Sequence, residues 1–109
     1  MTETGTTFPF EESIGVARDR FLSLLKPPPA VFTQEIPANV LENPMVIALA
    51  LMALRMTGCT IPDGNTPTET RLFETIAARE FITAVMRERP DVVYSMATGD
   101  LNLAARGEQ

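Results

Sequence analysis

The sequence contains no histidine, and this absence excludes a large part of enzyme chemistry. Histidine is the commonest general base, the usual partner of a nucleophilic serine or cysteine, and a frequent zinc ligand. The single cysteine, Cys59, permits neither an intramolecular disulfide nor a zinc site built from thiolates. The six glycines are scattered, and none lies in a phosphate-binding pattern. We therefore expect no cofactor and no metal, and predict that the protein is not an enzyme.

Two weaker chemical signals remain in the sequence. Cys59 follows the C-terminal end of an apolar segment, where a helix dipole would oppose a thiolate, so we interpret it as a structural thiol. Carboxylates at Glu69, Glu74 and Glu80 are five and six residues apart, which points them in different directions around a helix. An enzyme that uses carboxylates or a metal is thus only a third hypothesis.

Tryptophan is also absent and aromatic residues make up 6% of the chain, although 45% of the residues are hydrophobic. Aliphatic side chains and the six methionines must therefore fill the core. A length of 109 residues suits one domain. We predict a flexible N-terminal arm over 1–8, a single helical domain over 9–105 and a frayed tail over 106–109.

The sequence also has no apolar run as long as a membrane span, and we expect no secretory signal. The longest apolar run ends at Arg55 and is shorter than the ~20 residues that a membrane span needs. We expect no membrane span and a location in the cytoplasm or the interior of a virion. The net charge of −5 repels phosphate backbones, so nucleic acid is an unlikely partner.

Helical periodicity first becomes visible near residue 9. Apolar residues recur at spacings of three and four, which places them on one helical face: Phe10, Ile14, Ala17, Phe21, Leu24 and Leu25. Glu11 and Glu12 begin this segment and Lys26 ends it, an arrangement that complements a helix dipole. Three prolines at 27–29 then stop the helix. The pattern predicts a helix over about 9–26.

A proline-rich extended connector follows over 27–37, in which we expect Val31, Phe32 and Ile36 to pack across the helices. A short helical turn is predicted within 37–42. Asn43 can then cap a helix that has Pro44 at its first position. The next ten residues are all apolar and rich in Ala, Leu and Met, which favours a helix over about 44–57 that ends at Gly58.

The last main helix is predicted over about 67–89. Thr66 and Glu69 have capping-box spacing, and two apolar rows follow: Phe73, Ala77, Phe81 and Val85, and Ala78, Ile82 and Met86. One or two short helices follow Pro90, with Gly99 as a break and Asp100 as a possible cap. The fold class is therefore all-α, a small bundle of three main helices with one or two short C-terminal helices.

The helix over 44–57 has no polar face, and a helix of this kind must be enclosed on all sides. Either the other helices enclose it within the monomer, or another chain covers what they leave exposed. Our leading hypothesis is a non-enzymatic helical interaction protein, a homo-oligomer or a small subunit of a larger protein assembly. The alternative is an acidic regulatory or inhibitory protein that binds one macromolecular target. The candidate interface residues are Met45, Leu49, Met52, Met56, Arg79 and Arg87.

Overall fold

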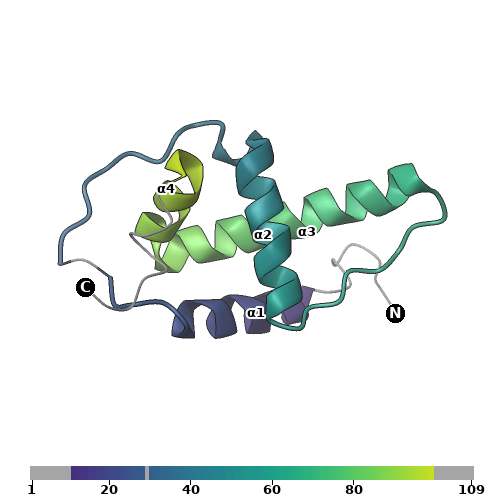
Figure 1. Ribbon diagram of the computed structural model, residues 1–109, viewed down its shortest axis with the longest axis horizontal. Helices are drawn as coiled ribbons and strands as arrows, with labels where there is room; N and C mark the ends of the chain where they lie inside the picture. Colours follow the sequence, from purple (N-terminus) through teal and green to yellow (C-terminus); the bar gives the residue numbers. More distant parts are fainter. Residues whose placement is uncertain (1–10, 29, 100–109) are drawn as a thin grey trace.

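The computed structural model describes residues 11–28 and 30–99, and within these ranges the protein is a helical bundle without strands (Figure 1). This confirms the predicted all-α fold class. The elements are α1 (Glu11–Ser23), the 3-10 turn η2 (Val40–Glu42), α2 (Pro44–Met56), α3 (Pro67–Glu88) and α4 (Pro90–Thr98). Each of these helices is too short or too polar to cross a membrane.

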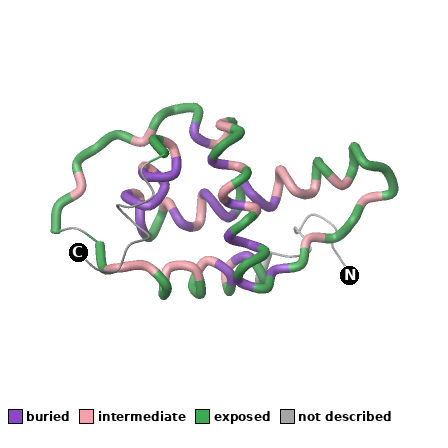
Figure 2. The backbone as a smooth tube through the Cα atoms, in the orientation of Figure 1, coloured by how far each residue is buried: buried purple, intermediate pink, exposed green. Residues whose placement is uncertain are grey.

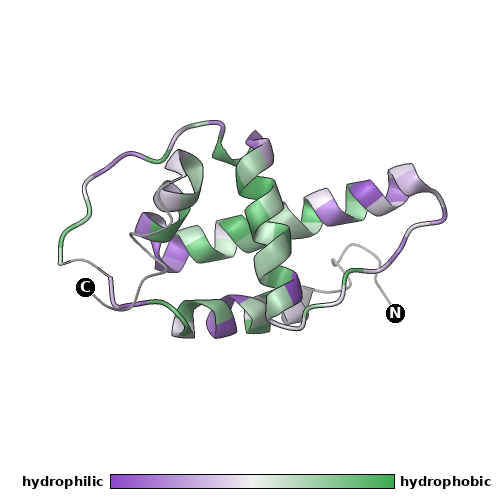
Figure 3. Ribbon diagram, in the orientation of Figure 1, coloured by the Kyte–Doolittle hydropathy of each residue, from purple (hydrophilic) through white to green (hydrophobic). Residues whose placement is uncertain are grey.

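The helices α1, α2 and α4 all pack against the longest helix, α3. In Figure 1, α2 crosses α3, α1 runs below both, and α4 lies at the C-terminal end of α3. The N-terminal half of α3 projects beyond α2 and is largely hydrophilic (Figure 3). Phe81 is fully buried and its ring meets that of Phe21 edge to face, with centroids 5.5 Å apart. The two predicted apolar rows of α3 supply much of the core, through Ala77, Ala78, Phe81, Ile82 and Val85.

The first helix is shorter than the sequence predicted. Residues 9–10 lie outside the described part of the chain, and α1 ends at Ser23 rather than near Lys26. The amides of Leu24 and Leu25 bond to carbonyls only three residues back, so the chain tightens and leaves the helical face. As a result Leu24 is 64% exposed, and its assignment to the packed face was wrong.

The connector between α1 and η2 is extended, as predicted, but only part of it packs. Phe32 lies edge to face against Tyr94 of α4, with ring centroids 5.7 Å apart. Ile36 is half-buried against the core. Val31, in contrast, is 73% exposed, which corrects the prediction that it would pack. The connector makes a wide arc that joins α1 to the opposite end of the bundle (Figure 1).

Side chains fix both ends of α2. Asn43 Oδ1 accepts hydrogen bonds from the amides of Met45 (2.9 Å) and Val46 (3.4 Å), which confirms the predicted cap. At the other end Gly58 has φ of 88°, the left-handed conformation expected of a helix terminator. The Arg20 guanidinium donates to the carbonyl of Thr57 at 2.9 Å and so ties α1 to the end of α2.

The start of α3 has one half of a capping box. The Thr66 hydroxyl accepts from the amide of Glu69 at 3.1 Å, as predicted. The Glu69 carboxylate, however, accepts from the amide of Asn65 at 2.7 Å rather than from that of Thr66. The side-chain bond of Glu69 thus reaches the amide of Asn65, one residue before the Thr66 amide that the capping box would use.

The junction between α3 and α4 forms at Arg89, whose non-helical backbone (φ −142°, ψ 76°) ends one helix before Pro90 begins the next. Its guanidinium makes two hydrogen bonds to the Asp91 carboxylate, of 3.0 and 2.9 Å, and both side chains are largely buried. Gly99, with φ of 81°, ends α4. The predicted arm, the last turn after Asp100 and the tail lie outside the described residues.

Candidate functional site

The helix α2 presents two different faces (Figure 2). Its inward side consists of Val46, Ala50, Ala53 and Leu54, all of which are buried. Its other side is open to solvent. We call the exposed residues of this helix the outer face of α2: Pro44, Met45, Ala48, Met52, Arg55 and Met56.

Among the apolar members of the outer face, the methionines are the most prominent. Met45 is 45% exposed, Met52 56% and Met56 69%. The neighbouring helices α1, α3 and α4 contact α2, but they leave this side uncovered. Within residues 11–28 and 30–99, therefore, the other helices do not enclose α2 on all sides. A helix that is hydrophobic over most of its surface (Figure 3) keeps one side in water.

The structure brings together only some of the predicted interface residues. Met45, Met52 and Met56 share the outer face, whereas Leu49 is half-buried and packs against the core. The reason is the helical repeat, because position 49 is rotated by about 40° from position 45 towards the buried side.

The two predicted arginines belong to a different part of the surface. Arg79 and Arg87 are both exposed on α3. The Arg79 Nε donates to the carbonyl of Leu41 at 3.0 Å, so this side chain lies beside η2 at the start of α2. Arg87 lies two turns further along α3, towards α4. Neither residue is a member of the outer face.

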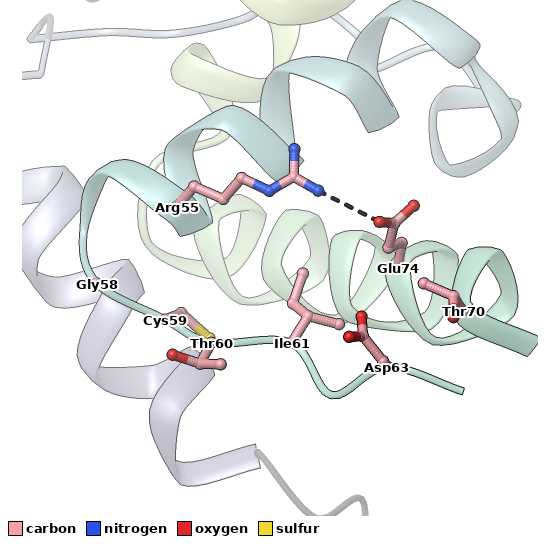
Figure 4. A pocket seen from close by; sticks show the side chains of 8 residues that line it. All are labelled: Arg55, Gly58, Cys59, Thr60, Ile61, Asp63, Thr70 and Glu74. Atoms are coloured by element: carbon pink, nitrogen blue, oxygen red, sulfur yellow. Dashed lines mark hydrogen bonds and ion pairs between the residues drawn. The ribbon is translucent and has the colours of Figure 1, made fainter. Parts of the chain in front are cut away.

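A hollow of about 400 Å³ adjoins the C-terminal end of α2 (Figure 4). Arg55, a member of the outer face, extends along its rim and forms an ion pair with Glu74 of α3 at 3.2 Å. The remaining lining comes from the loop between α2 and α3 and from the first turn of α3: Gly58, Cys59, Thr60, Ile61, Asp63 and Thr70.

The chemistry available in this hollow is modest. Burial raises the pKa of the Cys59 thiol, so it is protonated at neutral pH and is a poor nucleophile. The charge of Arg55 is compensated by Glu74, and the pair is partly exposed to water. Among the described residues, no group of three or more His, Cys, Asp or Glu side chains is placed to hold a metal ion. The hollow thus offers a compensated ion pair and a protonated thiol.

Three members of the outer face, Pro44, Ala48 and Arg55, were absent from the predicted interface residues. For Ala48 the sequence gives no signal, because the ten consecutive apolar residues contain no polar marker that distinguishes one face from another. For Arg55 its charge is such a signal, since it is the one charged residue of α2. No protein-family model, curated protein or solved structure matches the chain. The geometry of α2 is therefore the basis for a functional proposal.

Proposed function

We propose that the protein is a non-enzymatic helical interaction protein, either a homo-oligomer or a small subunit of a larger protein assembly. One observation supports this proposal: three apolar side chains of α2, those of Met45, Met52 and Met56, are exposed to solvent on its outer face. Contiguous apolar patches on the surfaces of proteins mark sites of interaction, because the contact of apolar surface with water is unfavourable in free energy.

Energetics support a partner for this surface. Covering a methionine side chain completely is worth roughly 1.5–3 kcal/mol relative to leaving it exposed. Met45, Met52 and Met56 are between 45% and 69% exposed, so much of that gain is still available to a bound partner. Methionine also has a flexible, polarisable side chain that adapts to the shape of a contacting surface.

The proposal that this function is not enzymatic rests on the residue types in the chain. Without histidine, an acid–base site would have to be built from carboxylates, lysine, tyrosine or cysteine. The one cysteine has a raised pKa, which is the wrong direction for an activated nucleophile. A lone, buried cysteine suits a reducing compartment such as the cytoplasm or the interior of a virion.

The experiment that tests the proposed function combines native mass spectrometry with hydrogen exchange on protein purified at its natural level. The expected result is an oligomer or a complex in which the amides of α2 gain protection relative to the isolated monomer. Met52→Lys should remove the association, whereas Leu24→Lys, at an apolar residue exposed to a similar extent outside α2, should leave it intact. A strict monomer with unchanged protection of α2 would overturn the proposal.

A further inference from the structure

The outer face of α2 has a symmetry that bears on the identity of its partner. Its six exposed positions are arranged symmetrically about residue 50, so that they pair as Pro44 with Met56, Met45 with Arg55, and Ala48 with Met52. An interface between two identical chains related by a twofold axis requires such an arrangement, since residue i of one copy must meet residue j of the other and the reverse.

The central pair, Ala48 and Met52, is also complementary in side-chain size. When two copies of α2 lie antiparallel and are centred on residue 50, the small Ala48 of each copy lies opposite the large Met52 of the other. A large side chain then fills the space left by a small one at two equivalent places, which is how packed helix pairs achieve native density. We propose that the outer face of α2 binds a second copy of this chain, with the two α2 helices antiparallel. This inference rests on the proposed function and names its partner.

Charge favours the antiparallel direction over the parallel one. Arg55 is exposed near the C-terminal end of α2, and Glu42 is exposed just before its N-terminal end. In an antiparallel pair each Arg55 approaches the Glu42 of the other copy, whereas a parallel pair would bring like charges together. Arg55 also keeps its intramolecular partner Glu74, so the contact adds a second carboxylate to an existing ion pair.

The size of the contact sets the expected affinity. A helix of 13 residues is about 20 Å long and about 10 Å wide, so one face of it is well below the ~800 Å² per partner of a standard interface. We therefore expect a weak dimer whose population depends on protein concentration.

The main test exchanges the two facing side chains, Ala48 and Met52. Sedimentation equilibrium of the full chain between about 10 μM and about 1 mM measures how strongly each variant dimerises. Ala48→Met should weaken dimerisation at least about tenfold, because two methionines then collide, and Met52→Ala should weaken it because a void remains. The double variant Ala48→Met, Met52→Ala should recover most of the affinity, since a large side chain again lies opposite a small one. Leu24→Met is the control outside α2, and circular dichroism verifies that each variant folds.

Disulfide trapping tests the direction of the helices. In a Cys59→Ala background, protein carrying Ala48→Cys is mixed with protein carrying Met52→Cys and oxidised. The antiparallel dimer should give the mixed product, which mass spectrometry distinguishes from either homodimer. Predominant homodimers of each variant would indicate parallel helices and overturn the proposal.

Two further outcomes separate this inference from the proposed function. If the chain is monomeric at the highest concentration but its α2 is protected in a complex with a different protein, the second-copy proposal is overturned and the proposed function stands. The end of α4 lies near the outer face, since a Cβ at Gly99 would be 3.9 Å from the Met45 Cε. A monomer that dimerises only when Leu101 and Leu103 are replaced by serine would mean that the chain's own C-terminal segment occupies this face, and would also overturn the second-copy proposal.

Discussion

Two buried hydroxyl groups of this bundle differ in whether they have a hydrogen-bond partner. The Thr57 hydroxyl donates towards the carbonyls of Ala53 (2.9 Å) and Leu54 (3.0 Å) at the end of α2. The Ser95 hydroxyl on α4 is fully buried and has no hydrogen-bond partner among the described residues. Because a buried polar group without a partner loses its hydration without compensation, the two residues should respond oppositely to removal of the hydroxyl.

Ser95→Ala should therefore leave the free energy of unfolding unchanged or raise it by up to about 1 kcal/mol. Thr57→Val, which removes a bonded hydroxyl at nearly constant shape, should lower it by about 1 kcal/mol. Urea unfolding followed by circular dichroism measures both. A loss of more than about 1 kcal/mol in Ser95→Ala would show that its hydroxyl has a partner after all.

Because Cys59 is buried, we expect the free energy of unfolding to depend on pH in alkaline solution. Burial raises the pKa of its thiol in the folded state, so the folded protein keeps a proton that the unfolded chain gives up in alkaline solution. The contribution of this residue is fully present below the unfolded pKa of about 8.5 and is lost as the pH rises through the higher folded value. The difference in unfolding free energy between wild type and Cys59→Ala should be constant from pH 6 to about pH 8 and then fall. A difference that does not change up to about pH 10 would contradict this.

At the scale of single elements, two asparagines provide a matched pair of variants. Asn43 caps α2 through its side chain, whereas Asn39, which precedes η2, makes no side-chain cap bond. Asn43→Ala should lower the free energy of unfolding by about 1 kcal/mol, because two helical amides lose their acceptor. Asn39→Ala should change it by less than about 0.5 kcal/mol. Equal effects in chemical denaturation would mean that the cap contributes nothing beyond local chain conformation.

The junction of α3 and α4 depends on one buried ion pair. Asp91→Ala would leave the Arg89 guanidinium buried without its carboxylate, and we expect a loss of about 3 kcal/mol. The exposed pair Arg18 and Asp19 is the control, because Asp19→Ala at a surface site should cost less than about 1 kcal/mol. Replacing both buried partners with apolar residues should be less damaging than Asp91→Ala alone. Thermal and urea unfolding of the variants would test this order.

The helices could be predicted from the sequence wherever a local signal marks their ends. Asn43-Pro44, Thr66-Pro67 and Gly58 specify helix termini through groups that act within one turn, and these termini were confirmed. The end of α1 was missed because Leu24 continues the apolar spacing, although the chain has already tightened there. Apolar periodicity alone does not show where a helix loses its geometry.

At the scale of the whole molecule, the sequence predicts which helix carries the candidate site but not which side of that helix is exposed. The sequence identified α2 as the helix that needs covering, but its ten apolar residues carry no information about which side meets the core. That choice depends on how α1, α3 and α4 are arranged in space, a property that no local pattern of α2 encodes. Arg55 was the only charged residue of α2, and it does lie on the exposed side.

The wide arc between α1 and η2 has a consequence for the order in which the molecule opens and closes. Shorter links join α2, α3 and α4 to one another. The contact of Phe21 in α1 with Phe81 in α3 instead closes a long loop, and the entropy lost in loop closure opposes that contact. Of the α1 residues whose burial the structure describes, only Ile14 and Ala17 are buried. We expect α1 to detach as a separate unit, so that its backbone amides exchange with deuterium faster than those in the middle of α3. Identical protection of both helices in a native-state exchange experiment would instead show that the bundle unfolds only as a whole.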